Sequence, residues 1–206
     1  MLTIAWDIDD VLNELTWVWF SEWWLPARPN CKMSYSNITE NPPDRVLEIT
    51  QAEYLSSLDG FRISERARAL QPNHEVLQWF ELFGVQYRHI AVTVRPLDST
   101  PCAAEWVFHH FGRYIRSFAV VPSRPPMGVA IYDRSKADFL TWFGKVDILI
   151  DDSQENVMAA EKIGVRGILF PQPWNKSSLT ISQTLESISV PQRGKPMFAG
   201  PCTESH

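Results

Sequence analysis

Short apolar runs alternate with amphipathic stretches along most of the chain. Five runs have the length and composition of buried strands: residues 2–6, 87–93, 117–121, 146–150 and 166–170. Between the second and third runs, Thr100 can cap a helix that begins at Pro101 and ends near Gly112. Before the second run, helically spaced apolar residues lead to Gly84, which is placed as a residue just beyond a helix end. Strands that alternate with helices predict an α/β fold with a doubly wound parallel sheet.

Residues 13–71 interrupt this alternation. They contain a Trp-rich helical stretch, a polar segment with Pro42 and Pro43, and further helical sequence. We interpret them as a small helical cap inserted after the first strand, so that residues 1–12 and 72–190 form the core. Residues 191–206 hold several prolines and glycines and few apolar residues, which predicts a flexible tail.

Composition narrows the class of protein. The chain of 206 residues has a formal net charge of −5 and no stripe of lysine and arginine, which argues against a nucleic-acid polymer as partner. No apolar run approaches the roughly 18 residues of a membrane span, and no signal peptide is recognisable at the amino terminus. Three scattered cysteines fit a reducing compartment. We therefore expect a cytoplasmic protein without a membrane partner; a homodimer stays open.

Acidic residues follow two of the predicted strands. Asp7, Asp9 and Asp10 come after the first, and Asp151 and Asp152 after the fourth. Parallel strands bind ligands beyond their carboxyl ends, so these carboxylates should face one crevice. Like charges at short range need a cation, and oxygen ligands without cysteine or histidine favour Mg²⁺. Each pair also has a structural interpretation, since Asp152 with Glu155 could cap the following helix.

Two further residues have the chemistry of an anion site. Thr93 ends the second predicted strand, where its hydroxyl could donate to a phosphate oxygen. Ser135 and Asp138 form a capping-box pattern that places Lys136 at the first position of a helix. A lysine there opposes the helix dipole, which indicates an anion nearby. Each residue taken alone also has a structural interpretation: Thr93 could be a turn or strand-end residue, and Lys136 could be a solvated surface lysine.

The ordered set Asp7-Ile8-Asp9, Thr93, Lys136 and Asp151-Asp152 resembles the motifs of the haloacid dehalogenase superfamily of phosphohydrolases. Within that superfamily the chain looks most like the small 5′-nucleotidases of the 5′(3′)-deoxyribonucleotidase type. This closer resemblance includes the segment that begins with Thr93 and Arg95, and it extends to about Asn175. Asp10 departs from the pattern, because many relatives have glycine there.

The resemblance implies an Mg²⁺-dependent phosphomonoesterase. Asp7 would attack phosphorus, and Asp9 would protonate the leaving alcohol and later activate water. The metal ligands would be the Asp7 carboxylate, the Asp9 backbone carbonyl and Asp152. Asp151 and Asn156 would orient these ligands without binding the metal themselves. Thr93 and Lys136 would bind the transferring phosphoryl group.

The choice of substrate depends on the cap. An α-helix over residues 17–24 would put Trp17, Phe20 and Trp24 on one face, with Trp19 and Trp23 on another. One aromatic face could stack on a nucleobase, with Phe20, Trp24 and the core residue Arg95 near the substrate.

The expected partner is thus a small-molecule phosphomonoester, with a nucleoside 5′-monophosphate preferred. The alternatives are a non-nucleotide ester such as a sugar phosphate, and a non-catalytic ligand-binding or interaction protein on the same scaffold.

Overall fold

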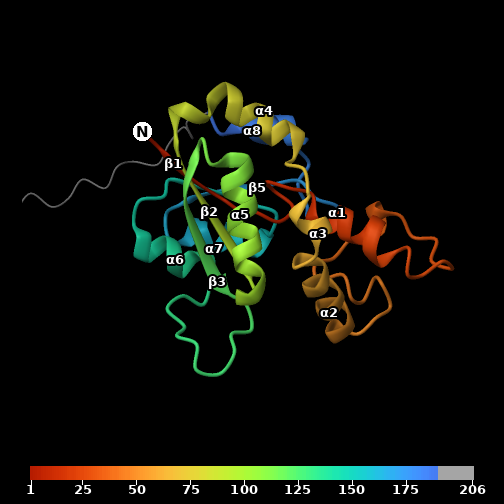
Figure 1. Ribbon diagram of the computed structural model, residues 1–206. Helices are drawn as coiled ribbons and strands as arrows, with labels where there is room; N and C mark the ends of the chain where they lie inside the picture. Colours follow the sequence, from red (N-terminus) through yellow and green to blue (C-terminus); the bar gives the residue numbers. More distant parts are fainter. Residues whose placement is uncertain (190–206) are drawn as a thin grey trace, which may run out of the picture.

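A computed structural model describes residues 1–189 of the chain and contains a five-stranded parallel sheet (Figure 1). The strands are β1 (Thr3–Trp6), β2 (Arg88–Arg95), β3 (Ile115–Pro122), β4 (Ile148–Asp151) and β5 (Arg166–Leu169). Their order in the sheet is β3-β2-β1-β4-β5, so the central strand β1 pairs with both β2 and β4. The sequence-based fold class is confirmed. The predicted tail lies outside the described residues.

Helices cover both faces of the sheet because successive strand residues point to opposite sides. Ile4 and Trp6 of β1 face a cluster that includes α4 (His74–Phe83), α5 (Thr100–Phe111) and α8 (Ile181–Ser187). Ala5, between them, faces the other cluster, to which α6 (Lys136–Phe143) and α7 (Gln154–Lys162) contribute. Strands apolar on both faces are what a sheet buried on both sides requires.

The segment between β1 and α4 forms the cap. Its elements are α1 (Leu15–Val18), the π-helix η1 (Trp19–Trp24), the 3₁₀-helix η2 (Tyr35–Asn37), α2 (Gln51–Arg62) and α3 (Glu65–Arg68). The chain leaves and re-enters the core at adjacent points, because Asn13 and Pro72 form an antiparallel bridge and the amide of Asn73 donates to Leu12 O at 2.8 Å. Figure 1 shows α1, α2 and α3 to the side of the sheet.

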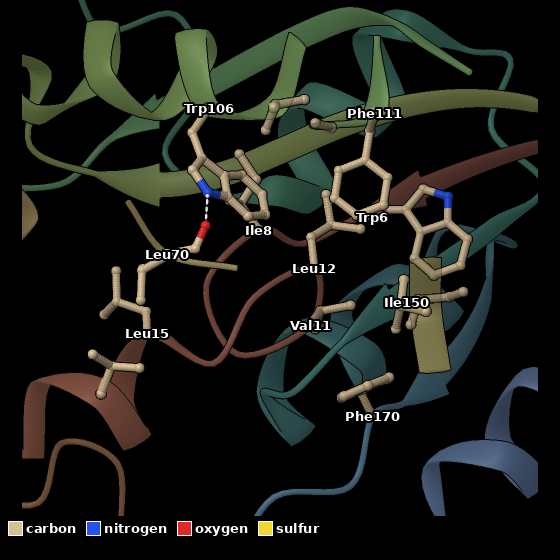
Figure 2. Close-up of a cluster of buried hydrophobic side chains, with 14 of the residues drawn as sticks. Trp6, Ile8, Val11, Leu12, Leu15, Leu70, Trp106, Phe111, Ile150 and Phe170 are labelled. Carbon is tan, nitrogen blue, oxygen red and sulfur yellow. Dashed lines mark hydrogen bonds between the residues drawn. The ribbon is translucent and has the colours of Figure 1, made fainter. Parts of the chain in front are cut away.

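A continuous apolar cluster joins the sheet to the base of the cap (Figure 2). Trp6 and Ile150 of the sheet lie in the same cluster as Leu15 of the cap. The indole of Trp106 on α5 donates to Leu70 O at 2.8 Å, which fixes the chain where it returns from the cap. The cap therefore rests on the core through buried packing as well as through two chain crossings.

Several predicted boundaries were wrong. β2 extends to Arg95, because Thr93, Val94 and Arg95 pair with the end of β3. Ser99, not Thr100, is the N-cap residue of α5. Gly84 lies just beyond the end of α4, as predicted, but its φ of −55° is not left-handed and the chain continues into the 3₁₀-helix η3 (Gly84–Gln86). The 3₁₀-helix η4 (Leu97–Ser99) comes later. A glycine at position 84 allows close packing, since a Cβ there would lie 2.8 Å from the ring of Tyr114.

The Trp-rich segment also differs from the predicted α-helix. Leu25 N donates to Phe20 O, five residues back, which is π-helical spacing. The wider turn brings Trp19, Phe20 and Trp24 together inside the cap and leaves Trp17 and Trp23 each 43 % exposed. The expected grouping of Trp17 with Phe20 and Trp24 was therefore wrong.

No helix within residues 1–189 combines the length and the apolar character needed to cross a membrane.

Candidate active site

The predicted motifs meet at the carboxyl edge of the sheet. Asp7 directly follows β1, where its amide donates to Ile150 O at 2.9 Å, and Asp151 ends the neighbouring strand β4. Thr93 lies near the end of β2 on the other side of β1. Because all five strands run in parallel, their carboxyl ends lie together.

Lys136 connects two of the motifs by direct contact. Its Nζ lies 2.7 Å from Asp7 Oδ1 and 2.6 Å from Asp151 Oδ2. The side chain is almost fully buried, so the solvated interpretation of Lys136 was wrong. Burial lowers the pKa of Lys136, but the charges of Asp151 and Asp7 outweigh burial and hold the pKa above its ordinary value. The ammonium therefore stays charged beneath the carboxylates.

The start of α6 positions this lysine as predicted. Ser135 is the N-cap residue and accepts a hydrogen bond from Asp138 N at 3.1 Å, which makes Lys136 the first residue of the helix. Asp138 accepts from Arg134 N rather than from Ser135 N, so only half of the predicted capping box forms. The unfavourable dipole position of Lys136 is offset by its two carboxylate partners.

Three buried carboxylates have the donor set of a hard divalent cation. Asp7, Asp151 and Asp152 each offer an oxygen, and these oxygens all lie within 4.8 Å of one another. Burial raises the pKa of Asp7 to about 6, and burial together with the charges of Asp151 and Asp7 raises the pKa of Asp152 well above its ordinary value. One lysine cannot neutralise three carboxylates. A cation with oxygen ligands, such as Mg²⁺, fits the charge that remains.

Asp151 and Asp152 differ in how their oxygens are engaged. Asp151 Oδ1 accepts from Ser153 N and Asn156 Nδ2 at 2.9 and 3.1 Å, while Oδ2 accepts from Lys136. Asp152 Oδ2 accepts from Trp174 Nε1 at 2.8 Å, and no hydrogen bond from residues 1–189 reaches its Oδ1. This difference favours Asp152 as a metal ligand, with Asp151 and Asn156 as supports.

The capping interpretation of Asp152 was wrong. Ser153 is the N-cap residue of α7 and accepts from Asn156 N at 3.3 Å. Asp152 is therefore not needed to begin the helix. Its orientation is set instead by Trp174 and Asn175, since Asn175 Nδ2 donates to Asp152 O at 2.9 Å. The hydrogen-bonding role of Trp174 could not be predicted, because an indole N–H in a loop has many possible acceptors.

Asp9 lies between two arginines. Arg95 Nη2 contacts Asp9 Oδ1 at 2.5 Å, and Arg62 Nη2 from the cap contacts Oδ2 at 3.1 Å. Burial raises the pKa of Asp9, but the charges of Arg95 and Arg62 outweigh it and hold the pKa below the ordinary value. Sequence reasoning missed Arg62, because a basic residue in the last turn of a helix is common for dipole reasons alone.

Asp10 has a structural role. Its φ of 65° lies in the left-handed region, which explains why glycine suits this position in the motif. The buried carboxylate accepts a hydrogen bond from Thr16 N at 2.8 Å and another from the Thr16 hydroxyl, and so caps α1. Burial raises the pKa of Asp10 to about 7. Gln172 Nε2 holds the backbone here by donating to Asp10 O at 2.7 Å.

Thr93 is buried near the carboxyl end of β2, and no hydrogen bond joins its hydroxyl to another residue in the range 1–189. Phe20 and Trp24, which were expected near the substrate, lie inside the cap. They are 1 % and 2 % exposed, and their rings stack at 5.5 Å inside the cap. A base could stack on Trp24 only after the cap rearranged, because Arg28 covers the ring at 4.3 Å.

Solved structures share this fold over almost the whole chain. A haloacid dehalogenase-like hydrolase from Streptococcus pneumoniae has a TM-score of 0.59 at 12% identity, over 92% of this chain and 91% of its own. YfnB from Bacillus subtilis, assigned as a HAD hydrolase and bound to magnesium, has a TM-score of 0.58 at 12% identity, over 91% and 96%.

A Thermotoga maritima protein assigned as a β-phosphoglucomutase has a TM-score of 0.57 at 16% identity, over 91% of this chain and 98% of its own. No family model matches the chain, and no curated protein matches its sequence. At these identities the likeness concerns the fold. The five-stranded parallel sheet flanked by helices is thus a fold that this chain shares with haloacid dehalogenase-like hydrolases.

Proposed function

We propose that this protein is an Mg²⁺-dependent phosphomonoesterase that forms an aspartyl-phosphate on Asp7. The observation that carries the proposal is the buried lysine between Asp7 and Asp151, beside a third carboxylate, at the carboxyl edge of the sheet. A purely structural ion pair would not need three carboxylates around one ammonium. The same excess of carboxylates is difficult to explain in a non-catalytic scaffold.

The side chains of the site can perform two successive displacements. Asp7 Oδ1 accepts from Ile8 N and Lys136, whereas no hydrogen bond from residues 1–189 reaches Oδ2. We assign Oδ2 as the oxygen that attacks phosphorus. Lys136 and the Thr93 hydroxyl would hold the phosphoryl oxygens, and charge on those oxygens would be offset by the Lys136 ammonium.

Asp9 would serve as the proton carrier. It would donate to the leaving oxygen in the first displacement and accept from water in the second. The charges of Arg95 and Arg62 favour the ionised form, which suits the second step directly. The first step requires that these contacts loosen when substrate enters.

Mg²⁺ fits the acidic side of the site. Asp7, the Asp9 backbone carbonyl and Asp152 would hold it, with Asp151 and Asn156 fixing the ligand positions. When bound, the ion supplies positive charge opposite the phosphoryl oxygens. Magnesium in the structure of YfnB, a protein of the same fold, supports this choice.

The sequence leaves two substrate classes open. A nucleoside 5′-monophosphate is suggested by the resemblance to 5′-nucleotidases, whereas a sugar phosphate agrees with the assigned β-phosphoglucomutase of the same fold. The burial of Phe20 and Trp24 removes the specific reason to expect a base stack. The geometry therefore gives no reason to prefer a nucleotide over a smaller phosphate ester.

The decisive experiment replaces Asp7 with Asn and measures hydrolysis of an aryl phosphate with Mg²⁺. Loss of the nucleophile should lower kcat by about 10³-fold or more. Asp98→Asn, at an exposed position, is the matched control and should retain activity. Beryllium fluoride with Mg²⁺ should bind against Asp7 in a crystal. Substantial turnover by Asp7→Asn would contradict the mechanism.

A further inference from the structure

A second set of positive charges lies beside Asp9. Arg62 comes from α2 of the cap and Arg95 from β2 of the core, and both contact the Asp9 carboxylate. A small cavity of about 20 Å³ adjoins them, and Arg68 also lines it. The charged residues around this cavity are three arginines and one aspartate. Arg62 also pairs with Asp59 at 3.4 Å, and Arg68 is exposed, so the two guanidiniums that a ligand could reach beside the cavity are those of Arg62 and Arg95.

The two arginines also have buried donors to spare. Arg62 Nε and Arg95 Nε are buried, and neither has a hydrogen-bond partner within residues 1–189. The Arg95 side chain is only 4 % exposed, so water does not readily satisfy it. Buried polar groups without partners are rare in folded proteins and mark sites where a partner is expected. A guanidinium binds carboxylate and phosphate groups with two parallel hydrogen bonds.

The position of the cavity identifies which part of a substrate would enter it. This step rests on the proposed function, in which Asp7 receives the phosphoryl group and Asp9 serves the leaving oxygen. Groups that lie beyond Asp9 therefore face the leaving alcohol. Arg62 and Arg95 stand on opposite sides of the boundary between cap and core, where a leaving group would be enclosed.

We propose that Arg62 and Arg95 bind an anionic group on the leaving alcohol, so that the preferred substrate is a compact phosphomonoester carrying a carboxylate or a second phosphate. The incoming anion takes the place that Asp9 now occupies between the guanidiniums. The Asp9 side chain is then released toward the leaving oxygen. The cavity of about 20 Å³ holds roughly one water, so the space for the anion comes mainly from the Asp9 carboxylate that it replaces, which suits a compact anion better than a nucleobase.

Matched esters test this proposal without any mutation. Carboxymethyl phosphate and ethylene glycol bisphosphate carry the second anion, whereas 2-hydroxyethyl phosphate is a neutral counterpart of similar size. We expect kcat/KM to be about 10- to 100-fold higher for at least one anionic ester, the range of a hydrogen-bonded charge. The two anionic esters separate a carboxylate preference from a phosphate preference.

Variants then assign the preference to the arginine. Arg62→Gln should remove most of the difference in kcat/KM between anionic and neutral esters, whatever loss all of the esters share because Arg62 also contacts Asp9. Arg66→Gln is the matched control, because Arg66 is a cap arginine that pairs with Glu22 on the surface and does not line the cavity. Arg66→Gln should keep the full preference. Melting temperatures of both variants report on folding.

Calorimetry separates this proposal from the proposed function. Asp7→Asn should bind carboxymethyl phosphate or the bisphosphate at least tenfold more tightly than 2-hydroxyethyl phosphate, and Arg62→Gln in that background should abolish the difference. Equal binding and equal kcat/KM for anionic and neutral esters would overturn the arginine site while leaving the phosphatase intact. Equal losses on all esters in Arg62→Gln would assign Arg62 to positioning Asp9 alone. If none of the esters were hydrolysed, the proposed function would be overturned. The calorimetric comparison of anionic and neutral esters would still test the arginine site.

Discussion

The indole of Trp174 donates a hydrogen bond of 2.8 Å to Asp152 Oδ2. This bond comes from the loop after β5 and restricts the rotation of a carboxylate that would otherwise be fixed only by its own backbone. Asp152 forms a cluster with Asp7 and Asp151, in which one oxygen of each carboxylate lies within 4.8 Å of the others. A carboxylate held in this way is already oriented for a cation.

Removing the donor should therefore weaken metal binding. Trp174→Phe keeps an aromatic ring against Tyr35 but loses the N–H, and we expect about 10- to 100-fold weaker Mg²⁺ binding. The measurement is the Mg²⁺ concentration for half-maximal activity, checked by calorimetry. Trp142→Phe, 76 % exposed on α6, is the control. An unchanged Mg²⁺ requirement would show that Trp174 is only packing.

Asp10 should contribute to stability through both its backbone and its side chain. Asp10→Ala loses the cap on Thr16 N and places a Cβ residue without local hydrogen bonding at positive φ, which should cost about 2 kcal/mol. Asp10→Asn should cost less, since asparagine tolerates this conformation and retains an acceptor oxygen. Urea unfolding of the two variants compares them. Equal losses would mean that charge, rather than geometry, explains the position.

His89 should make the fold sensitive to acid. Trp6 Nε1 donates to His89 Nδ1 at 3.0 Å, so Nδ1 carries no proton, and Nε2–H donates to Gly84 O at 2.7 Å. Burial lowers the pKa of His89. The folded state therefore binds fewer protons than the unfolded state below about pH 6.5, and its stability falls as the pH drops through that value.

The comparison variant is His89→Gln, whose amide can accept from Trp6 and donate to Gly84 without titrating. Below about pH 6.5, the wild type should lose up to about 1.4 kcal/mol per pH unit relative to this variant until His89 itself protonates. Denaturant unfolding at several pH values measures the difference. Parallel pH profiles for the two proteins would contradict the assignment.

Trp24 should behave as a core residue of the cap. Trp24→Ala removes a ring packed on Phe20 and should cost about 3–5 kcal/mol of stability. Losses of kcat/KM should be similar for a nucleotide and for a small ester. Trp17→Ala, at a position 43 % exposed, should change stability by less than about 1 kcal/mol. A selective loss of nucleotide turnover in Trp24→Ala would restore the base-stacking hypothesis.

The π-helical turn illustrates a limit of pattern reading. The sequence of residues 17–24 is compatible with α-helical or π-helical spacing, and the two assign different tryptophans to the interior. The edge-on contact between Trp19 and Tyr54 of α2, with ring centroids 5.4 Å apart, favours the turn that buries Trp19. Contacts between elements therefore overrode the local expectation.

The sequence by itself determined the parallel sheet, the insertion after β1, and the meeting of Asp7, Thr93, Lys136 and Asp151 at one edge. Strand periodicity predicts the sheet, and the rule that parallel strands end together predicts that Asp7, Thr93 and Asp151 meet, whereas Lys136 was predicted from its capping pattern and from the family resemblance. Only the tertiary structure decided that Arg62 reaches Asp9 and that Trp174 reaches Asp152. Those partners are separated by 53 and 22 residues, and their contacts depend on how the cap and the loop after β5 pack on the core. Sequence separations of this size leave no periodic pattern in the chain. Side-chain partners on different elements are therefore decided by how those elements pack in the folded protein.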